Sequence, residues 1–260
     1  MNTEHTQDAT VRLSLIAPAH DEEDNVQPLV EEVHAALGEL PGGFEFIVID
    51  DGSNDETRSR LLDLAKDRPW LHVMRMTNTP EGRGNGQSAA FHAGIRSARG
   101  ELIALIDADL QNDPADLPRM VALLDERQVD FVQGDRSANR RDNIVRRASS
   151  WVGRFFRRLI LGDSIRDTGC SLRVMKREIA LRIPLEFRGM HRFIPVTARQ
   201  LGYEVIEMPA SHRPRIAGEA KYGVWNRAIP GLIDCFAVRW MRGRRRPTSS
   251  ESCTPQQEAD

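Results

Sequence analysis

Short apolar runs alternate with amphipathic segments along the first half of the chain. Four runs rich in β-branched residues predict buried strands, at residues 13–17, 44–49, 71–74 and 102–106. The intervening segments carry apolar residues at helical spacing, which predicts helices over 25–37, 57–65 and 87–97. A fifth strand is expected at 131–133, after a helix that begins near Pro118. Because this alternation is typical of βαβ units, we predict an α/β fold with a mainly parallel central sheet.

Two later segments combine apolar side chains with arginine. Residues 151–161 interleave aromatic residues with arginines, and residues 225–240 carry apolar residues at helical spacing before the arginine-rich run 242–246. Both patterns suit a helix that lies at a membrane surface beside anionic headgroups. For 225–240, an ordinary amphipathic helix that covers the domain's own core is an equal alternative. We therefore expect a C-terminal amphipathic helical segment.

The composition is that of a folded domain. Hydrophobic residues make up 40% of the chain and charged residues 28%, and 260 residues are enough for one substantial core. The expected organisation is a polar N-terminal tail at 1–10, one main domain at 11–223, the amphipathic basic segment at 224–246 and a disordered tail at 247–260.

Cysteine usage and hydropathy bear on the compartment. Cys170, Cys235 and Cys253 are far apart, so they predict neither a zinc site nor a disulfide framework. Residues 1–10 lack an apolar signal-peptide core, and no window approaches the roughly 18 apolar residues that span a bilayer. We expect a cytoplasmic protein that attaches peripherally at the cytoplasmic membrane face.

The charge is unevenly distributed although the formal net charge is only −2. Residues 107–116 contain four aspartates and no basic residue, whereas residues 136–158 are rich in arginine. An acidic segment and a basic segment in one domain indicate a metal ion together with an anionic substrate.

Acidic turns follow three of the predicted strands. In an open α/β sheet, ligands bind at the carboxyl ends of the strands, so these turns are expected to converge on one crevice. Asp107 and Asp109 are two positions apart and can bind one hard cation, and Mg²⁺ or Mn²⁺ is the expected ion. The alternative for this segment is a solvated loop whose aspartate caps a helix. The glycines of 82–86 precede a predicted helix, whose N-terminus could receive a phosphate, or they form a flexible loop.

Four motifs carry a resemblance to a known family. They are Pro18-Ala19-His20-Asp21-Glu22-Glu23-Asp24-Asn25, Asp50-Asp51-Gly52-Ser53, Gly86-Gln87-Ser88-Ala89-Ala90 and Asp107-Ala108-Asp109-Leu110-Gln111. In this order and spacing, the chain resembles the family 2 glycosyltransferases over residues 11–240. It is most similar to their dolichol-phosphate mannosyltransferase-like branch, which uses polyprenyl phosphates.

The resemblance implies a GT-A nucleotide-sugar domain and roles for particular residues. Asp107, Asp109 and Gln111 are expected to hold the metal, and the two aspartates to be the catalytic pair. The residues expected to bind the nucleotide sugar are Pro18, His20, Asp21, Glu23, Ile49, Asp51 and Gln87. The family usually has Tyr-Asn where this chain has His20-Asp21, so both GDP-sugars and UDP-sugars stay open as donors.

Downstream residues match the acceptor side of this branch. By resemblance, Arg136, Arg146, Ser150, Arg215 and Lys221 bind the phosphate of the acceptor, and arginine suits this task because its guanidinium can hold phosphate bidentately. The family's serine is replaced by Ala220, so no role is carried over to that position. Segments 167–173 and 191–195 also match, and His191 is a binding candidate.

The expected reaction is inverting transfer of a hexose from a nucleoside-diphosphate sugar to a polyprenyl phosphate such as dolichyl or undecaprenyl phosphate. A phosphate acceptor is already largely an anion at neutral pH, so the reaction demands no general base. Two alternatives stand: a GT-A enzyme that glycosylates a soluble hydroxyl acceptor, and a non-catalytic basic protein that binds membrane surfaces. Nucleic acid is not an expected partner, because the arginines lie among apolar residues outside any recognised nucleic-acid module.

Overall fold

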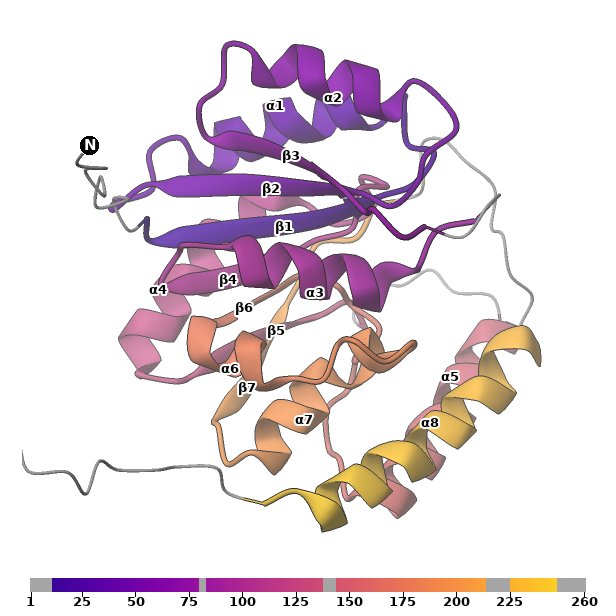
Figure 1. The fold of residues 1–260 in the computed structure, drawn as a ribbon. Helices are drawn as coiled ribbons and strands as arrows, with labels where there is room; N and C mark the ends of the chain where they lie inside the picture. Colours follow the sequence, from indigo (N-terminus) through magenta and orange to yellow (C-terminus); the bar gives the residue numbers. More distant parts are fainter. Residues whose placement is uncertain (1–10, 80–82, 138–143, 214–224, 247–260) are drawn as a thin grey trace, which may run out of the picture.

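The computed structural model describes residues 11–79, 83–137, 144–213 and 225–246. Its centre is a seven-stranded sheet in the order β3-β2-β1-β4-β6-β5-β7 (Figure 1). β6 runs antiparallel to both neighbours, and the other strand pairs are parallel. The strands are β1 Leu13–Ala19, β2 Phe44–Asp50, β3 Leu71–Arg75, β4 Leu102–Leu105, β5 Phe131–Asp135, β6 Arg173–Lys176 and β7 Val205–Pro209. The predicted α/β class with a mainly parallel sheet is confirmed.

Helices cover both faces of the sheet (Figure 1). On one face, α1 (Val26–Leu37) and α4 (Leu117–Arg127) share a buried cluster with alternate residues of β1 and β2, among them Leu15 and Phe46. On the other face, α3 (Gln87–Ser97), α6 (Arg177–Arg182) and α7 (Ile194–Gln200) pack on the intervening residues, such as Ile16. The alternation along the strands thus places one hydrophobic core on each side of the sheet.

The two arginine-bearing segments form helices that pack together. These are α5 (Ile144–Leu161) and α8 (Trp225–Arg244), which lie side by side beyond the edge of the sheet (Figure 1). Cys235 and Val238 of α8 are buried in the second core, so one side of this helix covers the domain. Among the described residues, no helix combines the length and apolar character needed to cross a bilayer.

The first half of the chain follows its hydrophobic pattern closely. The helix expected over 25–37 is α1, the one expected over 57–65 is α2 (Thr57–Ala65), and the strand expected at 131–133 extends to Asp135 as β5. The pattern did not reveal β6, β7, α6 or α7. The shorter elements include the 3₁₀ helices η1 (Pro114–Asp116) and η2 (Met190–Phe193).

Candidate active site

The carboxyl ends of β1, β2 and β4 meet at one edge of the sheet. These strands are parallel neighbours, and Ala19 at the end of β1 pairs in register with Asp50 at the end of β2. Just beyond, the Asp51 backbone N–H donates to the Ala19 carbonyl at 2.9 Å, and His20 Nδ1 lies 2.9 Å from the Asp51 carbonyl oxygen. The turns after β1 and β2 therefore meet, as the sequence predicts, and the third acidic turn follows β4 at the same edge of the sheet.

The first two acidic turns bind each other. The Asp21 backbone N–H donates to Ser53 Oγ at 3.1 Å, and the Asp21 carboxylate accepts the Asn54 N–H at 2.9 Å. Glu23 Oε2 likewise accepts the Glu56 N–H at 3.1 Å. Asp21 has a φ of 56°, a left-handed conformation that is uncommon outside glycine. Two residues expected at the nucleotide thus also fix the shape of its surroundings.

The carboxylate of Asp51 is held by the loop before α3. Its oxygens accept the backbone N–H of Asn85 at 2.9 Å and that of Gly86 at 2.6 Å. A Cβ on Gly84 would lie 2.4 Å from Asp51 Oδ2, so this approach requires a glycine. Gly84 therefore allows the close approach of Asp51, a role that neither the phosphate site nor the flexible loop expected from the sequence includes. The N–H groups of Asn85 and Gly86, which precede α3, donate to the Asp51 carboxylate.

Pro18 and Ile49 sit opposite each other on β1 and β2. The Ile49 side chain is fully buried in the core under α3, and Pro18 is partly exposed. Ile49 can therefore shape a nucleoside pocket through its backbone or by supporting its neighbours, while Pro18 presents surface of its own.

The third turn carries the aspartate pair. Asp107 and Asp109 are both partly buried just after β4, and Leu110 between Asp109 and Gln111 has a φ of 59° although its side chain lies in the core. The Asp109 carboxylate accepts the Gln111 N–H at 3.2 Å, which closes this tight turn. A branched residue in this conformation is strained, and such strain concentrates at functional sites.

Asp107 has neighbours of both signs. Gln87 Nε2 on α3 donates to its Oδ1, so the structure brings together two residues that the resemblance assigns to the donor site. Burial, then repulsion from Asp109, raises the pKa of Asp107 from 3.8 to about 6, against a hydrogen bond from Ser171 and the charges of Arg136 and Arg173. Two repelling carboxylates at a strand end are a favourable place for a cation.

The donor set fits a hard divalent ion. Asp107 and Asp109 would supply carboxylate oxygens and Gln111 an amide oxygen, which are the ligand types of Mg²⁺ and Mn²⁺. Within the described ranges, no cluster of three or more His, Cys, Asp or Glu side chains has the arrangement of a metal cage. Such a site relies on few protein ligands, as expected where phosphate oxygens complete the coordination.

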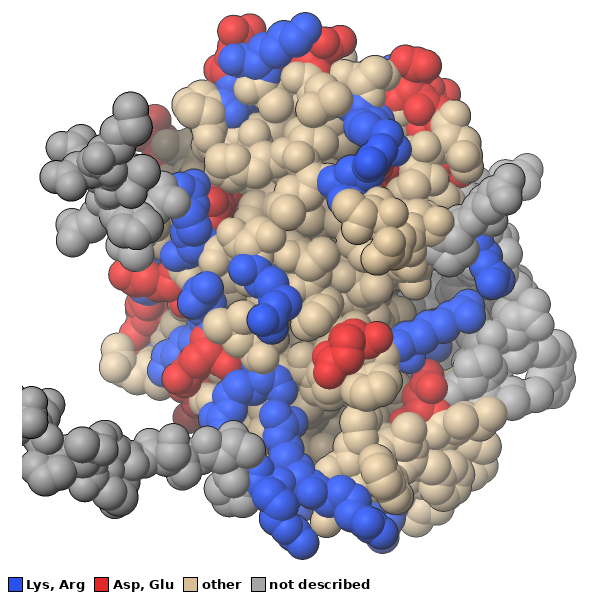
Figure 2. Space-filling view, in the orientation of Figure 1, with Lys and Arg blue, Asp and Glu red and all other residues tan. Residues whose placement is uncertain are grey.

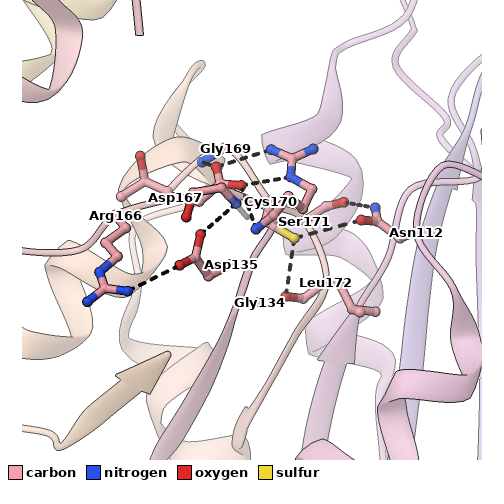
Figure 3. A network of polar contacts seen from close by, with 12 residues as sticks. Asn112, Gly134, Asp135, Arg166, Asp167, Gly169, Cys170, Ser171 and Leu172 are labelled. Atoms are coloured by element: carbon pink, nitrogen blue, oxygen red, sulfur yellow. Dashed lines mark hydrogen bonds and ion pairs between the residues drawn. The ribbon is translucent and has the colours of Figure 1, made fainter. Parts of the chain in front are cut away.

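Asn112, Cys170 and Ser171 belong to a network of buried polar contacts (Figure 3). Ser171 Oγ accepts from Asn112 Nδ2 at 2.8 Å and donates to Asp107, so one hydroxyl links Asp107, the first residue of the motif, with Asn112, the residue that follows the motif. Asn112 and Ser171 are almost completely buried, and the thiol of Cys170 contacts Asn112 Oδ1 at 3.7 Å. Sequence reasoning gave Ser171 no individual role. Its only signal was its place in the segment 167–173.

Arg136 lies beside this network. The Nε atom of Arg136 donates to Asp167 at 2.8 Å, and one of its terminal nitrogens donates to Asp167 at 3.2 Å, so two buried side chains form a bidentate pair. Although burial lowers the pKa of Arg136, the Asp167 hydrogen bonds and charge raise it above its ordinary value. Part of the guanidinium expected at the acceptor phosphate is thus engaged by Asp167.

A second buried arginine was not among the expected site residues. Arg173, at the start of β6, donates to the backbone oxygens of Cys170, Ser171 at 3.0 Å and His191 at 3.2 Å. Burial lowers its pKa to about 10, so it stays charged at neutral pH. The positive charge of Arg173 acts to lower the pKa of Asp107.

The remaining acceptor residues are only partly located. Arg146 and Ser150 belong to the first turns of α5, where the structure describes the backbone but not the side chains. Arg215 and Lys221 lie outside the described residues. Their expected roles stay predictions.

Comparisons with known proteins give this geometry a family. The family model described as "Glycosyl transferase family 2" matches residues 14–183. The dodecaprenyl-phosphate galacturonate synthase of Rhizobium johnstonii is 37% identical over 247 residues, which cover 92% of this chain and 70% of that protein. The undecaprenyl-phosphate 4-deoxy-4-formamido-L-arabinose transferase of Photorhabdus laumondii is 34% identical over 233 residues, 89% of this chain and 70% of that protein.

Solved structures agree on the fold. The mannosyltransferase PcManGT of Pyrobaculum calidifontis, in complex with GDP-Man and Mn²⁺, superposes with a TM-score of 0.61 at 20% identity, over 91% of this chain and 66% of that one. The glucosyl-3-phosphoglycerate synthase of Mycobacterium tuberculosis, in complex with UDP, gives 0.62 at 19% identity, over 87% and 80%. The chain belongs to glycosyl transferase family 2, and it is a glycosyltransferase of the polyprenyl-phosphate branch that its sequence resembles.

Proposed function

We propose that this enzyme transfers a sugar, with inversion, from a nucleoside-diphosphate sugar to a polyprenyl phosphate, and that a divalent metal is required. The observation that carries the proposal is the pair Asp107 and Asp109 just after β4, of which Asp107 is held by Gln87 and Ser171. The sequence relatives support the acceptor class, since their names give dodecaprenyl and undecaprenyl phosphate as acceptors. PcManGT, whose structure was solved in complex with GDP-Man and Mn²⁺, supports the donor class and the metal.

In this proposal the chain's residues bind and orient two anions. Asp107, Asp109 and Gln111 would hold Mg²⁺ or Mn²⁺, which when bound neutralises charge on the leaving diphosphate. His20, Asp21, Glu23 and Asp51 shape the nucleoside side.

On the acceptor side, the basic residues receive a phosphate that is itself the nucleophile. Arg136 and the buried Arg173 contribute positive charge there, and we assign the acceptor phosphate to Arg136, Arg146, Ser150, Arg215 and Lys221 as the resemblance implies. Stabilising the leaving group is then the main catalytic contribution of the protein.

The acceptor's lipid chain requires contact with a bilayer, and we assign this contact to α5 and α8. Large apolar side chains are exposed on both helices, among them Leu159 at 68%, Phe236 at 58% and Trp240 at 62%. Exposed arginines follow Trp240, and Figure 2 shows basic side chains gathered over the lower end of α8. Apolar side chains flanked by arginine are the pattern of a helix that binds an anionic membrane surface.

An acceptor comparison tests the proposal. The full chain is incubated with labelled UDP- and GDP-sugars, Mn²⁺, and either undecaprenyl phosphate, undecaprenol or a soluble oligosaccharide. We expect labelled lipid with undecaprenyl phosphate alone. Label on the oligosaccharide, with none on the lipid phosphate, would instead support a hydroxyl-directed enzyme of the same fold.

A further inference from the structure

His191 is held against the first turn of α3. It lies in η2, and Ser88 Oγ is 3.0 Å from its backbone nitrogen and 2.8 Å from its ring Nδ1. Arg173 donates to the His191 carbonyl at 3.2 Å from the other side. Both the backbone and the ring of this histidine are therefore fixed.

The contacts with Ser88 determine which ring nitrogen carries the proton. The His191 backbone N–H can only donate, so Ser88 Oγ accepts it. Ser88 is 3% exposed, and a hydroxyl proton left without an acceptor there would be costly. Its acceptor is Nδ1, which places the proton of the neutral ring on Nε2.

The ring's surroundings keep it neutral. Burial, then the positive charges of Arg192 and Arg173, lowers the pKa of His191 to about 3. A protonated ring would also lose its bond from Ser88, because Nδ1 would become a donor. His191 therefore presents one N–H donor and accepts no proton at neutral pH.

The Nε2 atom is the donor that the neutral ring has left once Nδ1 accepts from Ser88. His191 is partly exposed, and among the described residues its Nε2 has no hydrogen-bond partner. The residue before Ser88 is Gln87, which donates to Asp107, and Arg173 acts on both His191 and Asp107. Ser88, whose neighbour Gln87 contacts Asp107, and Arg173, whose charge acts on Asp107, thus connect His191 to the aspartate motif.

We propose that His191 is a substrate-binding residue whose fixed Nε2–H donates to a phosphate oxygen in the crevice. The inference deepens the proposed function and rests on it. A nitrogen that only donates is matched by an oxygen that only accepts, and the phosphates of the donor and of the acceptor provide such oxygens. Ser88 is then a positioning residue, which acts through the ring.

Paired variants and two phosphate ligands test this proposal. His191→Phe removes the donor, whereas His191→Gln keeps an N–H near the position of Nε2. His92→Phe, on α3, the helix that also carries Ser88, is the matched control. Binding of UDP and GDP with Mn²⁺, and separately of farnesyl phosphate, is measured by calorimetry on the full chain.

We expect His191→Phe to weaken either the nucleotide or farnesyl phosphate by at least about tenfold, as for a lost hydrogen bond to a charged group. His191→Gln should recover most of this loss, and Ser88→Ala, which keeps the ring, should show a smaller loss for the same ligand. The ligand affected identifies the source of the phosphate. Unchanged affinity for both ligands in folded His191→Phe would overturn the proposal, whereas a wild-type chain that binds neither ligand would contradict the proposed function itself.

The tautomer provides a separate check. Nitrogen-15 spectra of the labelled full chain should show His191 as the neutral Nε2–H form from pH 5 to 8. A ring that carries its proton on Nδ1, or that titrates within this range, would contradict the inference even if the enzyme were active.

Discussion

Replacing Ser171 with alanine isolates the support behind the aspartate motif. The hydroxyl of Ser171 donates to Asp107 and accepts from Asn112 Nδ2, so Ser171→Ala removes both contacts but leaves every proposed metal ligand in place. Residues that orient a metal ligand typically change metal affinity about 10- to 100-fold when they are lost. The amide of Asn112 also loses its buried acceptor, which costs about 1–3 kcal/mol of folding stability.

The same change has a defined effect on pH dependence. The pKa of Asp107 is raised to about 6, so its protonated form is favoured by folding, and the stability it contributes at low pH is lost as the pH rises through about 6. Metal requires the carboxylate, so metal affinity should rise over the same interval. Because the Ser171 hydrogen bond lowers this pKa, Ser171→Ala should move the rise in affinity to higher pH.

The assay is titration of Mn²⁺, with UDP or GDP present, followed by electron paramagnetic resonance between pH 5 and 8. Ser14→Ala is a matched control, because Ser14 is also fully buried and donates to a carboxylate, Glu45, at 2.6 Å. Both variants should lose stability in urea unfolding, but only Ser171→Ala should lose metal affinity. Wild-type metal affinity in Ser171→Ala, or an equal loss in both variants, would refute this account of the site.

Three further predictions follow from single contacts. Gly84→Ala places a Cβ 2.4 Å from Asp51 Oδ2, so we expect at least about tenfold weaker binding of UDP or GDP with Mn²⁺; unchanged calorimetric affinity would show that the Asp51 contact with the loop is dispensable. Asp167→Asn leaves Arg136 buried beside a neutral side chain and should lower the free energy of unfolding in urea by about 3–5 kcal/mol. The control Asp63→Asn removes the exposed ion pair with Lys66 and should cost less than about 1 kcal/mol, and equally small losses in both variants would contradict the buried-pair prediction. Phe236→Asp should reduce co-sedimentation with vesicles containing anionic lipid severalfold, and added salt should weaken wild-type binding; vesicle binding that neither change affects would remove α8 from the membrane contact.

The hydrophobic pattern predicted the strands and helices of the first half of the chain, because its periodicity is strong there. Runs such as 44–49 are buried on both faces, and their carboxyl ends could be placed at one edge from parallel pairing alone. β6 escaped prediction because it has four residues and begins with Arg173, a charged side chain that only the surrounding carbonyl oxygens make tolerable in the interior.

The sequence predicted which kinds of side chain lie at the site, but not which residues contact one another there. The aspartate motif stands out from its place after a strong strand, but the partner of Asp107, Ser171, is 64 residues away along the chain. For the same reason the contacts of the Asp51 carboxylate were not predicted, because its two backbone N–H donors come from the loop before α3. Such contacts depend on how the loops meet, which local spacing does not encode.

The most direct measurement of the central claim is metal-dependent formation of a lipid-linked sugar. Wild-type chain and Asp109→Ala are compared with undecaprenyl phosphate, a panel of labelled UDP- and GDP-sugars, and Mn²⁺, Mg²⁺ or EDTA. We predict a labelled lipid product from at least one donor with the wild type, lost on addition of EDTA and in Asp109→Ala. Full activity in Asp109→Ala, or no lipid-linked sugar from any donor, would contradict the claim that this aspartate motif serves transfer to a polyprenyl phosphate.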